Sequence, residues 1–228
     1  MRIMNYQAAI FDMDGLLLDT ERVCMQIFKQ ACIAQQLPFY ENVYFSMIGR
    51  NAAGIENILK EVYGDDLDRL RNDWRERYDV VVKHKAIPVK EGVVELLEWL
   101  KKNNIPTAVA TSTAREVAQI KLKLAGLDKY FDNITTGCEV NDGKPDPEIF
   151  LLAAKRLNIE PAFCLAFEDS NNGIRAAVGA NMIAFQIPDL VEPSEEIRQL
   201  GQSILPSLCD VLSQLKHSQI KRRSLQPE

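Results

Sequence analysis

The chain contains 228 residues with a mass of 25.8 kDa, enough for one large domain or for a core that carries a smaller inserted domain. Apolar residues make up 46% and charged residues 26%, as in ordinary globular proteins, so collagen-like and disordered classes are excluded. The formal net charge of −5 comes without a concentrated basic face, which argues against nucleic-acid binding. No apolar run reaches the roughly 18–20 residues of a membrane-spanning helix, and residues 1–7 lack the apolar stretch of a secretory signal.

The five cysteines are odd in number and lie far apart, with no C-x-x-C pair among Cys24, Cys32, Cys138, Cys164 and Cys209. This pattern favours reduced thiols and argues against both a disulfide framework and a zinc site. We therefore expect a cytoplasmic protein that is either an enzyme or a binder of small molecules, with no membrane or nucleic-acid partner.

The first predicted element is a buried strand over residues 8–11, a short apolar run that ends at Asp12. Residues 20–86 then contain no convincing strand, and their apolar residues recur at helical spacing. We expect this stretch to form an all-helical cap. Two short connectors, at 16–19 and 86–88, would join it to the rest of the chain and act as a hinge.

Strands and helices alternate in the remainder of the chain. Further apolar runs predict strands at 107–110, 133–136, 163–167 and 182–185. Helical patterns occur at 93–102, 115–124, 148–157 and 173–178. This alternation predicts an α/β fold with a parallel sheet covered on both faces, whose strands all end at one ligand-binding edge. The core would then comprise residues 1–19 and 87–215, followed by a disordered polar tail at 216–228.

Acidic residues follow the first strand directly, as Asp12 and Asp14, with Gly15 behind them. Two carboxylates at this spacing can converge on one cation, and the glycine permits a tight approach. An isolated D-x-D sequence is more often an acidic turn, so this motif alone is weak evidence for a site.

Polar residues also stand at the ends of later strands. Thr111 and Ser112 precede the sequence 113–116, a capping-box pattern that starts a helix whose N-terminus suits a phosphate, although capping alone also explains it. Lys144 lies in a rigid Gly-Lys-Pro-Asp-Pro sequence, where a solvated surface lysine is an equal alternative. Glu168-Asp169 emerges from a buried strand, which is unusual unless a cation or a basic side chain offsets the charge.

These groups together predict a phosphoryl-transfer site that binds Mg²⁺. Hard cations prefer carboxylate oxygens and substrate phosphates as ligands. A lysine and helix N–H groups match the charge of a phosphoryl group. One carboxylate can serve as the nucleophile and form an aspartyl-phosphate, while a second carries protons.

The sequence resembles the haloacid dehalogenase-like hydrolases, in the branch of the β-phosphoglucomutase-like phosphatases. The similarity spans about residues 8–215 and rests on four motifs in order: Asp12-Met13-Asp14-Gly15-Leu16-Leu17-Leu18-Asp19-Thr20-Glu21, Thr111, Lys144-Pro145-Asp146-Pro147 and Glu168-Asp169-Ser170-Asn171-Asn172-Gly173. The resemblance implies a Rossmann-like, doubly wound parallel sheet with an all-helical cap inserted after the first strand.

The resemblance also implies catalytic roles. Asp12 would attack phosphorus, and Asp14 would protonate the leaving alcohol and then activate water. Lys144 would offset charge on Asp12 and on the phosphoryl group. Thr111, together with Ser112, would bind that group.

The same resemblance implies a metal site and a substrate contact. Mg²⁺ would be held by Asp12, the backbone carbonyl of Asp14 and Asp169, with Glu168 nearby or bonded through water. Arg50 lies in a loop that matches the family's substrate-selecting loop and would contact the leaving group.

Two departures from β-phosphoglucomutase favour hydrolysis. Cys24 stands where that enzyme has a histidine of its mutase cycle, and Ala114-Arg115 replaces its Lys-Asn pair. We therefore predict a monomeric Mg²⁺-dependent phosphatase of a small phosphorylated metabolite, either a sugar phosphate or a nucleotide-like phosphate. The alternatives are a phosphosugar mutase of the β-phosphoglucomutase type and a binding protein that keeps the fold without turnover.

Overall fold

The core of the protein is a six-stranded parallel sheet, seen in a computed structural model that describes residues 6–48 and 52–224. The strands are β1 (Ala8–Phe11), β2 (Thr107–Thr111), β3 (Asn133–Thr136), β4 (Cys164–Glu168), β5 (Ile183–Gln186) and β6 (Ser203–Ile204). Their spatial order is β3-β2-β1-β4-β5-β6, so the chain winds outward on one side of β1 and then returns to wind outward on the other. This confirms the predicted Rossmann-like fold, in which ligands bind beyond the carboxyl ends of the strands where the winding reverses.

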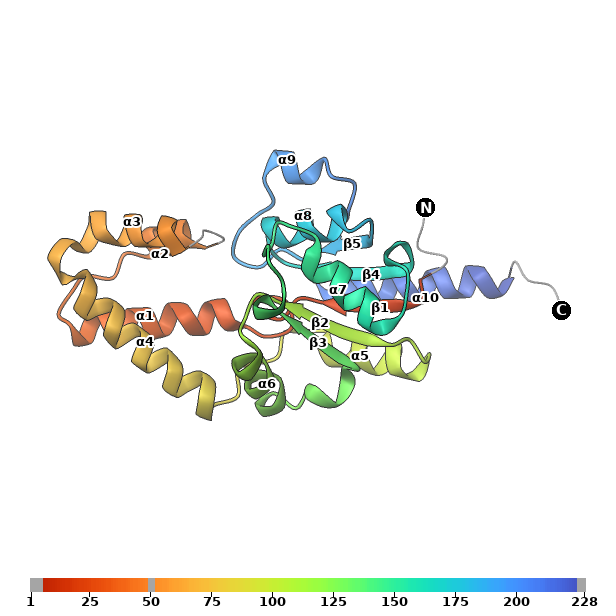
Figure 1. The fold of residues 1–228 in the computed structure, drawn as a ribbon, viewed down its shortest axis with the longest axis horizontal. Helices are drawn as coiled ribbons and strands as arrows, with labels where there is room; N and C mark the ends of the chain where they lie inside the picture. Colours follow the sequence, from red (N-terminus) through yellow and green to blue (C-terminus); the bar gives the residue numbers. More distant parts are fainter. Residues whose placement is uncertain (1–5, 49–51, 225–228) are drawn as a thin grey trace.

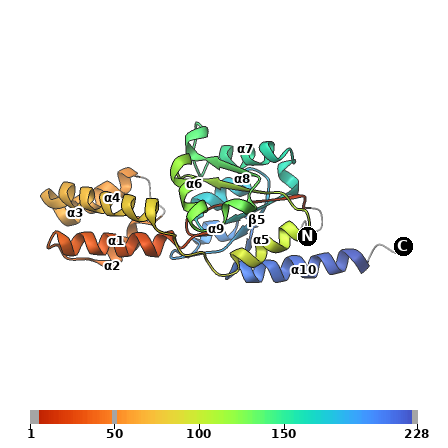
Figure 2. The same ribbon diagram turned by 90° about the horizontal axis from the view of Figure 1, so that it is seen from below.

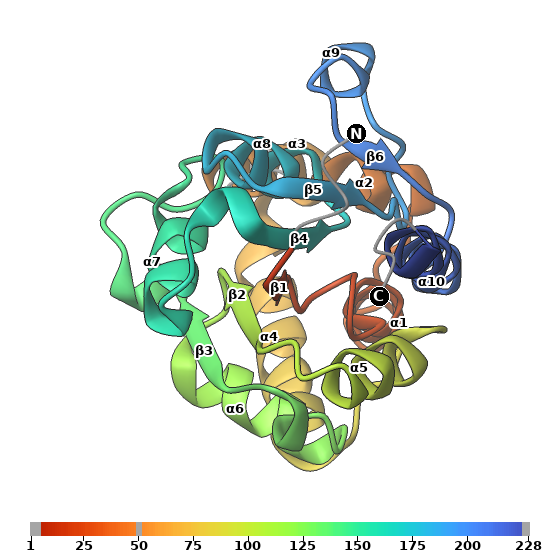
Figure 3. The ribbon, with the colours of Figure 1, turned by 90° about the vertical axis from the view of Figure 1, so that its right-hand side faces the viewer.

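Helices cover both faces of this sheet (Figure 3). They are α5 (Val93–Lys102), α6 (Arg115–Leu124), α7 (Glu148–Leu157), α8 (Asn171–Gly179) and α10 (Leu208–Ser224), with a short α9 (Glu195–Arg198) near β6. In β1, Ala8 and Ile10 belong to the apolar layer of α7 and α8, whereas Ala9 and Phe11 belong to that of α5 and α10. Both faces of the strand are therefore buried, which explains why its sequence is apolar throughout.

Four helices form a group apart from the sheet, here called the helical segment: α1 (Thr20–Ala34), α2 (Glu41–Met47), α3 (Ala52–Tyr63) and α4 (Leu67–His84). They lie together at one end of the molecule (Figures 1 and 2). Their own apolar cluster surrounds Phe28, whose ring centroid lies 4.8 Å from that of Trp74 and 5.9 Å from that of Tyr44. Burial of these rings gives the helical segment an apolar cluster of its own, distinct from the two that cover the sheet.

The chain passes between the core and the helical segment twice, and the two connectors run side by side. The Asp19 N–H donates to the carbonyl of Pro88 at 2.8 Å, and the Lys90 N–H donates to the carbonyl of Leu17 at 3.0 Å. Backbone hydrogen bonds thus join the two connectors to each other.

Helix α10 differs from the sequence-based expectation, because it continues to Ser224 where a disordered tail was expected from Lys216 onward. The helix lies along α5 (Figure 2), and Gln219 Nε2 donates to Oδ1 of Asn103 at 2.6 Å. Packing on α5 therefore extends the helix into a polar sequence. Among the described residues, no helix has the length and apolar character needed to cross a membrane.

Candidate active site

Asp12 stands at the point where β1 ends, and the loop behind it turns tightly. Gly15 has a φ of +84°, and its N–H donates to Oγ1 of Thr20 at 3.0 Å. A Cβ at Gly15 would lie 2.2 Å from Oδ2 of Asp169, so only glycine leaves room for that carboxylate. The N-cap of α1 is Asp19 and not Thr20. The Thr20 hydroxyl instead accepts this hydrogen bond from Gly15 and so stabilises the loop.

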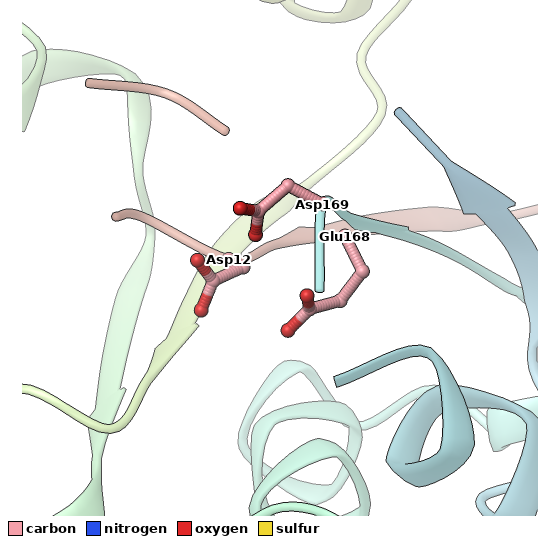
Figure 4. Close-up of side chains that lie close together, drawn as sticks. All are labelled: Asp12, Glu168 and Asp169. Carbon is pink, nitrogen blue, oxygen red and sulfur yellow. The ribbon is translucent and has the colours of Figure 1, made fainter. Parts of the chain in front are cut away.

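Three carboxylates converge at the carboxyl ends of β1 and β4. Asp12, Glu168 and Asp169 can each offer one oxygen such that all three oxygens lie within 4.8 Å of one another. Figure 4 shows the three side chains pointing toward one another from the two strands. Adjacent parallel strands bring these residues together although 156 positions separate Asp12 from Glu168.

Lys144 inserts its ammonium group between two of these carboxylates. Its Nζ lies 2.5 Å from Oδ1 of Asp12 and 2.5 Å from Oε1 of Glu168, and it donates to the carbonyl of Ala110 at 2.9 Å. The lysine side chain is 7% exposed, so it is a buried member of the cluster and not a solvated surface lysine. Glu168 also accepts hydrogen bonds from the backbone N–H and the hydroxyl of Ser170, both at 3.0 Å.

Negative charge is in excess in this cluster, because three carboxylates share one ammonium group. Burial raises the pKa of Asp12 to about 8 against the lowering effect of Lys144, and Glu168 and Asp14 raise it further. Burial also raises the pKa of Asp169, with Glu168 and Asp12 as further causes. A hard divalent cation fits this donor set, since it would offset the excess charge with oxygen ligands alone.

A cavity of about 540 Å³ opens beside the cluster. The core lines it with Asp12, Asp14, Thr111, Ser112, Lys144 and Asp169, and Glu21 of α1 and Ile48 of the helical segment also border it. The structure thus brings six of the predicted site residues to one space, with Glu168 buried behind Lys144. Arg50, the remaining predicted residue, lies outside the described residues.

The predicted capping box at α6 is wrong. The N-cap is Ala114, which makes no side-chain cap bond. The Thr113 hydroxyl instead donates to Oδ2 of Asp14 at 2.6 Å, and the Thr113 N–H donates to Oγ1 of Thr111 at 3.1 Å. Thr113 therefore holds the carboxylate of Asp14, which lines the cavity, instead of capping α6.

Lys121 was missed by the sequence analysis. It lies on α6 between Ala118 and Leu122, and all three are buried. Its Nζ donates to Oδ1 of Asp14 and to Oη of Tyr78, both at 2.8 Å. The sequence does show a lysine on the apolar face of an amphipathic helix. Such a lysine ordinarily buries only its aliphatic chain and keeps its ammonium group in water, so the pattern alone does not indicate a site residue.

Cys24 and Arg115 mark the two departures from β-phosphoglucomutase, and both lie outside the cavity lining. Cys24 lies against the apolar cluster of the helical segment, and burial raises the pKa of its thiol to about 11. Arg115 donates to the carbonyl of Ile134 at 2.9 Å and pairs with Glu139. Neither Cys24 nor Arg115 is among the described residues that line the cavity.

Comparisons with known proteins agree with this architecture. The family model of the haloacid dehalogenase-like hydrolases matches residues 6–181. A phosphorylated carbohydrates phosphatase of Thermotoga maritima is 35% identical over 178 residues, which cover 77% of this chain and 82% of that protein.

Two solved structures are similar over almost the whole chain. A candidate β-phosphoglucomutase from Thermotoga maritima matches with a TM-score of 0.79 and 31% identity, over 92% of this chain and 99% of that one. CbbY from Rhodobacter sphaeroides, in complex with phosphate, matches with a TM-score of 0.73 and 26% identity, over 90% of this chain and 96% of that one. The chain therefore belongs to the haloacid dehalogenase-like hydrolase family, in its β-phosphoglucomutase-like branch.

Proposed function

We propose that the protein is a Mg²⁺-dependent phosphatase that hydrolyses a small phosphomonoester, a sugar phosphate in the first place, through an aspartyl-phosphate. The observation that carries this proposal is the convergence of Asp12, Lys144 and the Glu168–Asp169 pair at one cavity. A relative that acts on phosphorylated carbohydrates and a similar structure that binds phosphate support the same substrate class.

Asp12 is the nucleophile in this proposal. Its carboxylate forms a bond to phosphorus while the bond from phosphorus to the leaving oxygen breaks, and Asp14 gives a proton to that oxygen. Lys144 stabilises the charge that spreads over the phosphoryl oxygens, and the hydroxyls of Thr111 and Ser112 hold the group in place. All five residues line the same cavity.

Water completes the cycle. Asp14 takes a proton from a water molecule whose oxygen attacks phosphorus, the bond between phosphorus and Asp12 breaks, and inorganic phosphate is released. Asp12, Asp169 and the Asp14 backbone carbonyl would hold Mg²⁺, with Glu168 behind them. The bound ion would screen the negative charge shared by the carboxylates and the phosphoryl group.

The helical segment is proposed to be the cap, which comprises residues 20–86. It supplies Glu21 and Ile48 to the cavity border, and its two connectors lie side by side, as a hinge requires. Substrate choice would then depend on which side chains this segment presents to the leaving group.

A phosphosugar mutase remains the second candidate, because one similar structure is a candidate β-phosphoglucomutase. A mutase must protect its aspartyl-phosphate from water until it is passed on. Cys24 and Arg115 do not supply groups to the cavity among the described residues, which favours hydrolysis.

Phosphate release from a panel of sugar phosphates, nucleoside monophosphates and p-nitrophenyl phosphate tests the proposal. We expect release with Mg²⁺, none with EDTA, and a loss of about 10³-fold or more in Asp12→Asn. The exposed Asp65→Asn variant is the matched control and should retain full activity.

Three other outcomes would contradict the proposal. Full turnover of Asp12→Asn would remove the nucleophile. Conversion of β-glucose 1-phosphate to glucose 6-phosphate, with a trace of the bisphosphate and without phosphate release, would indicate the mutase. A panel without any hydrolysis, but with a ligand that raises the melting temperature, would indicate a binding protein.

A further inference from the structure

Asp14 is held from the core side by a buried lysine that lies outside the carboxylate cluster. We propose that Lys121 of α6 is a positioning residue, which fixes the Asp14 carboxylate for its proton transfers to the leaving oxygen and from water. This inference rests on the proposed function, because it concerns the group assigned there to move protons.

The contacts of Asp14 define its orientation. Oδ1 accepts a hydrogen bond from Lys121 Nζ at 2.8 Å, and Oδ2 accepts one from the Thr113 hydroxyl at 2.6 Å. The Asp14 side chain is 25% exposed, toward the cavity that it lines. Two donors on separate oxygens restrict rotation of the carboxylate, which a single hydrogen bond would allow.

The Lys121 side chain is only 1% exposed, so its ammonium group depends on protein groups and not on water for its hydrogen bonds. Burying an ammonium group is costly unless a counter-charge and hydrogen-bond acceptors are present. The Asp14 carboxylate and the Tyr78 hydroxyl supply these, since both accept hydrogen bonds from Lys121 Nζ at 2.8 Å.

Lys121 also joins Asp14 to the helical segment. Its Nζ donates to Oη of Tyr78 on α4 at 2.8 Å and lies 5.5 Å from the centroid of that ring. Lys144 cannot take over this role, since its Nζ contacts Asp12 and Glu168. The two buried lysines thus divide the site, one serving the nucleophile and the other the proton carrier.

The role predicts a dependence on the leaving group. A p-nitrophenolate leaves without a proton, whereas the alkoxide of a sugar phosphate requires one, and kcat/KM reports only the steps up to phosphoryl transfer. Lys121→Met should therefore lower kcat/KM about 10- to 100-fold for a sugar phosphate and less than about threefold for p-nitrophenyl phosphate. Lys123→Met, at an exposed position of α6, is the control and should change neither value.

A double-mutant cycle with Asp14→Asn separates positioning from general damage. If Lys121 acts through Asp14, the double variant Asp14→Asn with Lys121→Met should be no slower on the sugar phosphate than Asp14→Asn alone. Tyr78→Phe removes only one hydroxyl and should show the same leaving-group dependence with a smaller loss, which keeps the test available if Lys121→Met does not fold.

Equal losses of kcat/KM on both substrates, multiplicative losses in the double variant, or unchanged kinetics of Lys121→Met would overturn the inference. The proposed function is tested separately, by the activity of Asp12→Asn. An inactive Asp12→Asn with unaffected Lys121→Met removes the inference alone, whereas an active Asp12→Asn removes the proposed function.

Discussion

Two glycines let the acidic groups of the site approach the backbone. A Cβ at Gly173, in the first turn of α8, would lie 1.8 Å from the carboxylate of Glu168, and one at Gly15 would lie 2.2 Å from that of Asp169. Gly15 in addition has a φ of +84°, a conformation that other residues adopt at a cost. The carboxylates therefore depend on the absence of two side chains as much as on their own hydrogen bonds.

Gly15→Ala should displace Asp169 and weaken metal binding. We expect the Mg²⁺ concentration for half-maximal activity to rise about tenfold or more, as for loss of groups that orient metal ligands. Gly201→Ala is the matched control, because Gly201 has a φ of +88° and open space around its Cβ position. It should bear the same backbone strain without changing the Mg²⁺ requirement. An equal Mg²⁺ requirement in the two variants would contradict the packing of Gly15 against Asp169.

At the scale of the elements, one carboxylate ties three of them together. Glu139, just after β3, forms ion pairs with Arg156 of α7 at 2.6 Å and with Arg115 of α6. Its carboxylate also accepts hydrogen bonds from the backbone N–H and the hydroxyl of Thr136, both at 2.9 Å. Arg156, Thr136 and Arg115 hold the pKa of Glu139 well below its usual range. The network fixes the helices that flank β3.

Glu139→Gln should lower the free energy of unfolding by about 1 kcal/mol at pH 7, a modest value because the arginines are partly exposed to water. Since the folded pKa is depressed, this stabilisation is present above the unfolded value of 4.5 and is lost as the pH falls below it. Urea unfolding at several pH values measures the difference, which should shrink below pH 4.5. The exposed Glu61→Gln variant should match the parent throughout, and a difference for Glu139→Gln that grows at low pH would refute the assignment.

Local periodicity accounts for most elements. Five of them begin and end as the sequence predicts: residues 8–11, 93–102, 115–124, 133–136 and 148–157. Strand β6 has only two residues, which is too short for any periodic pattern. Local patterns failed at Thr113 because its hydroxyl partner is 99 positions away in the sequence, and at Lys121 because a buried lysine needs a distant carboxylate that periodicity does not contain.

At the scale of the whole molecule, one side chain contacts a residue just beyond each of the two connectors between the core and the helical segment. Oδ1 of Asp189, in the loop after β5, accepts a hydrogen bond from Arg22 of α1 at 2.7 Å and another from Lys90. The Asp189 side chain is 3% exposed and borders the cavity. The order of strands along the sheet explains why strand-end residues meet here, but the sequence alone does not show which loop contacts the two connectors.

Asp189→Asn should loosen this junction, because it removes the carboxylate that pairs with Lys90 and one of the two carboxylates that pair with Arg22. We expect the free energy of unfolding to fall by about 1–2 kcal/mol and hydrogen exchange to accelerate at residues 85–90. Asp79→Asn, which removes the partner of the exposed Lys83, should leave both unchanged. Unaltered exchange in Asp189→Asn would show that the junction does not depend on this carboxylate.

The claim that unites these scales is that Asp12 carries the phosphoryl group during turnover. The most direct test is mass spectrometry of the Asp14→Asn variant, quenched in acid after mixing with Mg²⁺ and p-nitrophenyl phosphate. This substrate needs no proton to leave, whereas release from the enzyme needs Asp14, so the intermediate should accumulate. The account predicts one phosphoryl group on the peptide that contains Asp12, absent when Asp12→Asn is added; a phosphoryl group on another residue, or turnover undiminished by Asp12→Asn, would contradict it.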